Sequence, residues 1–454
     1  MSCVERGEAR GTLPADLSIC DAHLFYKGHL LEGCIAISDG EIIYVGKGAG
    51  APEAEKVVDG RGLLALPGPI DAHVHLRDEG LAYKEDFFTG TCSAVAGGIT
   101  SVLDMPNTIP PVDSPSRLRE RMEKARKDVV ANVGFFSLLP SSLDKIKAIA
   151  EAGAVGFKVY LHEPKTALPI SDESVLRKAM ELANRAGLPI AFHAEDRAAI
   201  EEAGRGLCGD IGPIERFVRS HPPEAEVRAV ERLARGLRGL RIHVCHMSVP
   251  EAVRLARSAG FSVEATPHHL FLSASAYERF GPLALMDPPL RREELVLELR
   301  SLLYSGLIDI VASDHAPHAL WEKLDPSSAP PGIPGLETLL PLLLNEVVER
   351  RLSLSQLVEL LCKRPAEVFG LDTGSIELNR PADIVLVDLK AEVLIEPERF
   401  LSKAKYSPFK GLKLRGAPVY TIVNGHIAFE KGEVMAERGC GRILKPKRRG
   451  GDEI

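Results

Sequence analysis

The chain has 454 residues, of which 45% are hydrophobic and 26% charged, so it can bury a large core. Its net charge of −7 is small for this length, which argues against a nucleic-acid-binding protein with a basic surface. No run reaches the roughly 18 apolar residues of a membrane span, and eight irregularly spaced cysteines do not indicate a disulfide framework. The polar N-terminal residues contain no apolar signal segment, and we therefore expect a cytoplasmic protein.

Both ends of the chain are predicted to form short β-strands. Alternating apolar and polar residues recur between residues 17 and 58, and the pattern returns in Ala382–Leu389 and Ala417–Gly425. We expect residues 1–66 and 376–454 to pair into one small β-sandwich.

Residues 67–375 repeat a different unit, in which apolar runs with polar C-terminal ends alternate with helical patterns such as Val175–Gly187. The runs are GPIDAHVHLRD, ITSVLDMPN, NVGFFSLLP, AVGFKVYLHE, LPIAFHAED, RIHVCHMS, FSVEATPHH and IDIVASDHAPH. Strands that alternate with helices predict a parallel sheet, and eight of them predict an α/β fold of the (β/α)8 TIM-barrel type. An open, doubly wound sheet is the alternative, but no glycine-rich dinucleotide loop follows the first strand.

Polar side chains gather at the C-terminal ends of these predicted strands, where barrel enzymes carry their active sites. The candidate metal ligands are His73, His75, Lys158, His193, His246 and Asp314. Imidazole and carboxylate donors without thiolates argue against a cysteine-rich structural zinc site, and their number fits two metals that share a hydroxide. Lys158 is unexpected in this set, because a metal would repel its ammonium unless the group is neutral or modified. We expect His268, His269 and Cys245 to be structural.

The motifs DAHVHLRD, GFKVY, AFHAED, CHMS and SDHAPH occur in this order on a barrel flanked by a split sandwich. They resemble the cyclic amidohydrolases of the amidohydrolase superfamily, and the resemblance covers nearly the whole chain after about Leu17. It implies that Lys158 is carboxylated by CO2 and bridges two zinc ions as an anion, which removes the charge conflict. It also implies that Asp314 acts as general acid and base toward the metal-bridging hydroxide that attacks the cyclic amide.

Three further residues bear on the substrate. Arg77 in HLRD, Asn107 in MPNT and His318 in DHAPH resemble the carboxylate clamp of the dihydroorotase branch of this family, and Pro331–Thr338 resembles its substrate loop. The resemblance implies reversible cyclisation of N-carbamoyl-L-aspartate to L-dihydroorotate in pyrimidine biosynthesis. It also implies a homo-oligomer, with aspartate carbamoyltransferase as a candidate partner and no nucleic acid or membrane as ligand.

Two alternatives to this reaction stay open. The first is an allantoinase or a hydantoinase- or dihydropyrimidinase-like cyclic amide hydrolase. The second is a non-catalytic scaffold homologue, against which the filled ligand positions argue.

Two features of the barrel loops leave questions for the structure. Asp287 stands where many dihydroorotases have asparagine before PPLR, and its charge would repel an anionic substrate unless it points away. Leu161–Pro169 follows Lys158 and is either a mobile lid or an ordinary loop.

Overall fold

The computed structural model describes residues 8–9, 14–207, 209 and 211–447, so most of the polar N-terminal stretch lies outside the described residues. Eight parallel strands form the predicted barrel, with the strand order β7 to β14. They are β7 (Ile70–Val74), β8 (Ser101–Asp104), β9 (Asn132–Leu138), β10 (Gly156–Tyr160), β11 (Ile190–His193), β12 (Ile242–Val244), β13 (Ser262–Ala265) and β14 (Ile310–Val311). Each contains the core of one predicted run, so the barrel prediction is confirmed.

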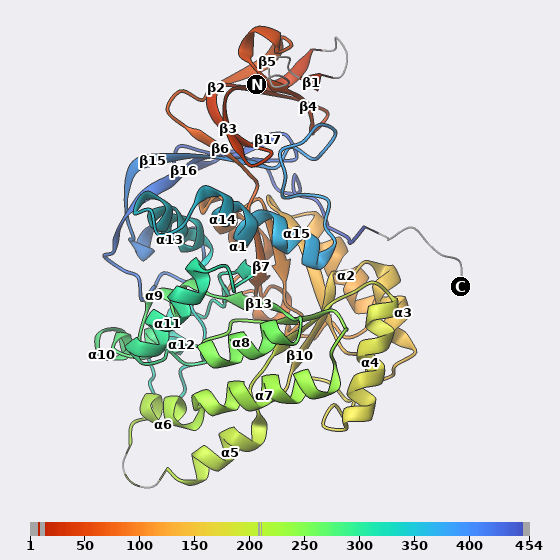
Figure 1. Ribbon diagram of the computed structural model, residues 1–454, viewed down its shortest axis with the longest axis vertical. Coiled ribbons are helices and arrows are strands. Elements are labelled where there is room, and N and C mark those ends of the chain that lie inside the picture. Colours follow the sequence, from red (N-terminus) through yellow and green to blue (C-terminus); the bar gives the residue numbers. More distant parts are fainter. Residues whose placement is uncertain (1–7, 10–13, 208, 210, 448–454) are drawn as a thin grey trace.

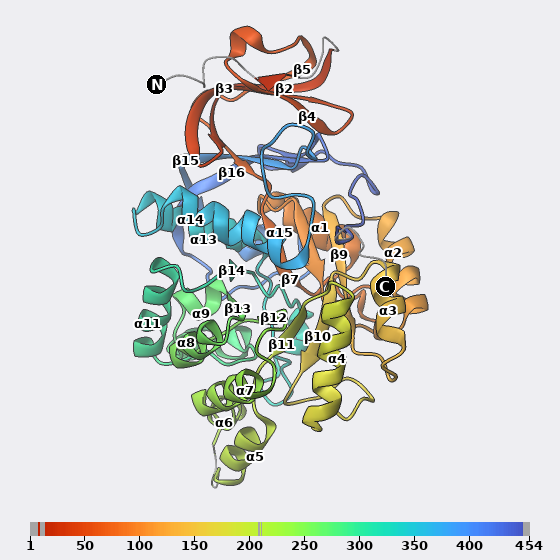
Figure 2. The same ribbon diagram turned by 45° about the vertical axis from the view of Figure 1, so that its right-hand side comes forward.

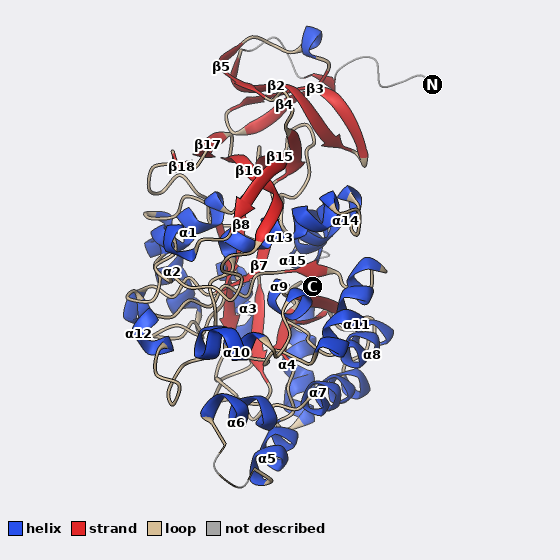
Figure 3. Ribbon diagram, turned by 90° about the vertical axis from the view of Figure 1, so that its left-hand side faces the viewer, coloured by secondary structure: helices blue, strands red, loops and turns tan. Residues whose placement is uncertain are grey.

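The barrel closes between its first and last strands, because the backbone N–H of His75 donates to the carbonyl of His315 at 2.8 Å. Almost every strand residue is buried, since helices cover the outside and side chains fill the inside. Figure 3 shows these helices around the strands.

The larger helices of this layer follow the strands in chain order. They are α1 (Phe87–Ala96), α2 (Pro115–Arg126), α3 (Lys145–Ala152), α4 (Glu173–Arg185), α7 (Pro223–Gly236), α8 (Pro250–Ser258), α11 (Glu293–Tyr304) and α13 (Leu336–Val348). Smaller helices are α5 (Arg197–Arg205), α6 (Pro213–Ser220), α9 (Pro267–Phe271), α10 (Ala276–Phe280), α12 (Leu320–Lys323), α14 (Leu354–Val358) and α15 (Arg364–Phe369). Short 3-10 or π turns lie at Gly48–Gly50, Glu79–Leu81, Gly281–Ala284, Glu359–Lys363 and Pro397–Arg399. None of the described helices is long and apolar enough to cross a membrane.

The two chain ends pair as predicted, and they are hydrogen-bonded into one mixed sheet of ten strands. These are β1 (Glu8–Ala9), β2 (Ala15–Tyr26), β3 (His29–Ser38), β4 (Glu41–Gly46), β5 (Ala54–Asp59), β6 (Leu64–Pro67), β15 (Ile384–Leu394), β16 (Lys413–Val423), β17 (His426–Glu430) and β18 (Glu433–Val434). Strands β6 and β15 join the two ends, and a shared apolar core includes Ile19 and Ile384. The sheet lies at one end of the barrel (Figures 1 and 2).

One feature of this sheet was not predicted. Cys20 and Cys34, on neighbouring strands β2 and β3, form a disulfide. The spacing of the cysteines in the sequence does not indicate this pair, because the pairing of β2 with β3 brings the two thiols together.

Candidate metal centre and substrate cavity

All six predicted metal ligands line one cavity of about 220 Å³ at the C-terminal ends of the barrel strands. Each is at most 9% exposed. Strand β7 carries His73, β10 carries Lys158 and β11 ends in His193. His75 directly follows β7, whereas His246 and Asp314 lie in the loops after β12 and β14. In chain order the six are His73, His75, Lys158, His193, His246 and Asp314.

His73, His75 and Asp314 form the first half of this cluster. The Nε2 atoms of His73 and His75 lie 3.4 and 3.2 Å from Asp314 Oδ1. Their Nδ1 atoms lie 2.9 Å from Glu264 Oε1 and 2.8 Å from Asn107 Oδ1, and both oxygens can only accept. In its neutral form each ring therefore carries its hydrogen on Nδ1 and turns the Nε2 lone pair toward Asp314, as in metal-binding histidines. The three residues can hold one metal ion.

Lys158, His193 and His246 form the second half. The His193 and His246 ring centroids are 4.5 Å apart, and His193 Nε2 lies 2.8 Å from Glu195 Oε2, which leaves Nδ1 free for a ligand. Lys158 Nζ and His246 Nδ1 are buried without a hydrogen-bond partner among the described residues. A buried ammonium without an acceptor is costly, so this lysine suits conversion to an anion that binds metal. The donor set therefore fits the metal centre that the resemblance implies.

Burial favours the neutral form of most of these imidazoles. Burial lowers the pKa of His75 to about 4 and that of His193 to about 4, against the effect of nearby carboxylates. Burial and Lys158 also disfavour protonated His73, but Glu264 and Asp314 outweigh them and raise its pKa to about 10. A bound cation would displace this proton, because metal binding requires the neutral imidazole.

Three residues of the site have a left-handed backbone. The φ angles are +54° at Arg77, +37° at His246 and +46° at Asp314. Such angles cost about 1–3 kcal/mol each in residues other than glycine, and they cluster at functional sites. Other described residues, such as Asp21 and Arg350, share this conformation, but these three lie among the candidate ligands and the substrate-binding residues.

The three predicted substrate-binding residues line the same cavity. Arg77 Nη2 lies 3.3 Å from His318 Nε2, and Arg77 Nε donates to the carbonyl of Pro317 at 3.2 Å. Asn107 has an additional contact that its motif did not predict, since its Oδ1 orients His75.

A buried ion pair that the sequence motifs did not indicate supports the backbone of Arg77. The Arg121 guanidinium is 0% exposed and donates to Asp104 Oδ2 from Nε and Nη2, at 3.0 and 2.7 Å. The same Nη2 donates to the carbonyl of Arg77 at 3.1 Å. Asp104 also accepts the backbone N–H of Leu76 at 2.9 Å. This pair holds the backbone of the turn that presents Arg77.

Lys84 is a second residue that the motifs did not indicate. Its Nζ lies 2.9 Å from His318 Nδ1 and 3.0 Å from Glu322 Oε1. An ammonium only donates, so His318 Nδ1 is the acceptor and the ring hydrogen sits on Nε2, which lies 3.1 Å from the carbonyl of Pro331. Lys84 thus favours the tautomer whose Nε2–H donates to the carbonyl of Pro331 in the substrate loop.

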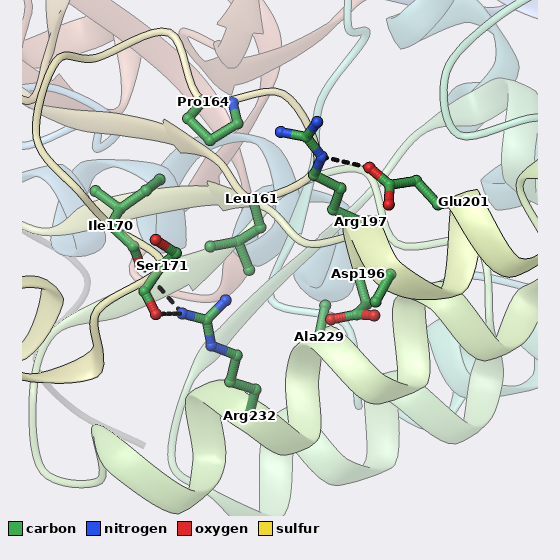
Figure 4. A pocket seen from close by; sticks show the side chains of 10 residues that line it. Leu161, Pro164, Ile170, Ser171, Asp196, Arg197, Glu201, Ala229 and Arg232 are labelled. Atoms are coloured by element: carbon green, nitrogen blue, oxygen red, sulfur yellow. Dashed lines mark hydrogen bonds and ion pairs between the residues drawn. The ribbon is translucent and has the colours of Figure 1, made fainter.

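The segment Leu161–Pro169 separates this cavity from another one. The cavity lined by the six candidate ligands, here called the metal cavity, is also lined by His162, Glu163 and Lys165. Behind the segment lies a cavity of about 340 Å³ (Figure 4), where Arg232 donates to the carbonyls of Ile170 and Ser171 at 3.0 and 3.2 Å. None of the predicted ligands lines this second cavity. Whether the segment moves as a lid stays a prediction.

Asp287 does not point away from the site. It lines the metal cavity, with Oδ1 3.9 Å from His193 Nε2 and Oδ2 3.6 Å from His162 Nε2. Its carboxyl group therefore faces the volume that a substrate would enter, and burial and the nearby Glu195 raise its pKa.

The fold, the barrel position of the cavity and its donors are those of a metal-dependent cyclic amidohydrolase. The chain belongs to the amidohydrolase family, whose model matches residues 64–428. It is 34% identical to a dihydroorotase from Methanosarcina mazei, over 95% of this chain and 98% of that protein. It is 39% identical to a dihydroorotase from Thermus aquaticus, over 87% and 95% of the two chains.

Solved structures support the same class. An L-hydantoinase (dihydropyrimidinase) from Arthrobacter aurescens superposes with a TM-score of 0.87 at 30% identity, covering 95% of this chain and all of that one. A D-hydantoinase from Thermus sp. superposes with a TM-score of 0.84 at 25% identity, over 95% and 99% of the chains. The shared fold extends over nearly the whole chain, including the mixed sheet.

Proposed function

We propose that this protein is a dihydroorotase, which catalyses the reversible cyclisation of N-carbamoyl-L-aspartate to L-dihydroorotate and water. The observation that carries the proposal is the position of Arg77 and His318 in the same cavity as the candidate ligands. A guanidinium and an N–H donor suit the free carboxylate of dihydroorotate, which the rings of allantoin and hydantoin lack. The similarity to dihydroorotases over nearly the full length supports the same choice.

The proposal assigns the six candidate ligands to a centre of two zinc ions. His73, His75 and Asp314 would hold one zinc ion, and His193 and His246 the other, with carboxylated Lys158 as the bridge. When bound, the two ions would activate the attacking water and polarise the carbonyl that it attacks.

The residues of the chain position the substrate and move the proton. Arg77, His318 and the Asn107 amide bind the α-carboxylate and thereby fix the reacting carbonyl at the ligand cluster. Although burial opposes its charged form, His73 and His75 hold the pKa of Asp314 well below its usual range, so it is a carboxylate at neutral pH. Asp314 takes the proton of the attacking water and gives it to the leaving ring nitrogen. Ring closure uses the same steps in reverse.

A substrate panel tests the proposal. We expect turnover of dihydroorotate and carbamoyl aspartate to exceed that of hydantoin, dihydrouracil and allantoin, with zinc counted in the same sample. Faster turnover of hydantoin or allantoin would assign the chain to another branch of the family. Absence of both zinc and activity after addition of zinc and bicarbonate would favour the scaffold homologue.

The expected partners are also proposals. Sedimentation of the chain alone, and of its mixture with aspartate carbamoyltransferase, would test self-association and that pairing.

A further inference from the structure

A second cluster of metal-binding side chains lies beside the six predicted ligands and contains none of them. Its members are His162 after β10, Glu195 after β11, His221 between α6 and α7, and Asp287 before α11. One ligand atom from each of Glu195, His221 and Asp287 lies within 4.8 Å of the others, and the same holds for His162, His193 and Glu195. Four separate segments thus converge at Glu195.

Two carboxylates in this cluster lack donors for their oxygens. Glu195 is 0% exposed, and its Oε2 is used by His193, whereas Oε1 has no hydrogen-bond partner among the described residues. Asp287 Oδ1 is likewise buried without such a partner. Arg291 Nη2, which has no hydrogen-bond partner among the described residues, lies 3.9 Å from Glu195 Oε1, within ion-pair range but beyond hydrogen-bond range. Glu195 is therefore a buried carboxylate with one oxygen that accepts no hydrogen bond, and Asp287, whose side chain is 21% exposed, adds a second carboxylate beside it. A bound metal ion would satisfy both oxygens.

The two histidines each bring a ring nitrogen close to Glu195. His221 Nδ1 lies 2.9 Å from the carbonyl of Phe217, which can only accept, so its Nε2 is left without hydrogen. His162 Nε2 lies 3.6 Å from Asp287 Oδ2, and its Nδ1 has no partner among the described residues. Two imidazole nitrogens and two carboxylate oxygens form a set that suits Zn²⁺.

We propose that His162, Glu195, His221 and Asp287 bind one additional Zn²⁺ ion. The ion would offset the charge that Asp287 directs into the substrate cavity, where it would otherwise repel an anionic substrate. It would also attach the segment Leu161–Pro169 to the barrel through His162. The site is independent of the dihydroorotase assignment, because none of the four residues belongs to the predicted catalytic set.

Zinc counting on the full chain tests this site. The protein is stripped with a chelator, reloaded with Zn²⁺ and bicarbonate, separated from free zinc by gel filtration, and analysed by mass spectrometry of the metal. We expect about three zinc ions per chain in the wild type, about two in His221→Gln and in Asp287→Asn, and about one in Lys158→Ala. His29→Gln, which changes an exposed histidine of the mixed sheet, is the control and should match the wild type.

Anomalous X-ray scattering at the zinc edge locates the ion in the wild type, even where a variant does not fold. A peak between Glu195, His221 and Asp287 is expected. Two zinc ions in the wild type with no peak there would overturn the proposal, as would an unchanged zinc count in both His221→Gln and Asp287→Asn. The dihydroorotase proposal fails on a different result, the substrate panel, so the two failures are distinguishable.

Discussion

Replacement of Arg77 by methionine tests the carboxylate clamp most directly. Arg77 is 8% exposed, so methionine can occupy a similar buried volume without the charge. Its Nε is engaged by the carbonyl of Pro317, and Nη2 faces His318 within the cavity. A hydrogen bond to a charged group contributes about 1.5–3 kcal/mol, which corresponds to about 10- to 150-fold in kcat/KM at about 1.4 kcal/mol per tenfold. We expect this loss for dihydroorotate, mostly as a raised KM.

The assay compares two substrates that share a ring. Dihydrouracil lacks the carboxylate, so Arg77→Met should change its kcat/KM far less than that of dihydroorotate. Arg235→Met, at an exposed position on α7 that pairs with Glu231, is the matched control and should behave as the wild type. An equal loss for dihydroorotate and dihydrouracil would refute the clamp, because it would mean that Arg77 supports the fold rather than the carboxylate.

Three more predictions concern lysines of the site and its surroundings. Lys158→Ala should lose the two zinc ions of the catalytic centre together with activity, and near-normal zinc content there would rule out the carboxylated bridge. Lys84→Met should raise the KM for dihydroorotate about fivefold, the equivalent of about 1 kcal/mol, because His318 can then switch tautomer. Lys84→Arg should keep the KM near that of the wild type. Equal KM values in the two variants would contradict this role of Lys84. Burial lowers the pKa of Lys323 from 10.5 to about 7. The buried ammonium therefore destabilises the folded state by a constant amount below pH 7, and this destabilisation decreases as the pH rises toward 10.5. The difference in Tm between Lys323→Met and the wild type should therefore shrink from pH 7 to pH 10, and a constant difference would count against it.

The sequence by itself predicted the barrel and the set of candidate metal ligands that the structure brings into one cavity. Strands of a parallel barrel are buried on both sides, so they appear as continuous apolar runs, and their C-terminal ends are the one place where polar residues recur. Alternation of side chains along a strand does not by itself place Arg77 beside His73, because β7 ends at Val74 and Arg77 has a left-handed backbone.

Only the tertiary structure decided which groups meet across the barrel. His73 contacts Glu264, 191 residues away, and Lys84 contacts His318, 234 residues away. Strand periodicity gives the face of a side chain but not its partner, because barrel closure and the path of each loop set those contacts. For the same reason the sequence left the direction of Asp287 open, and the fold turns it into the cavity toward His193.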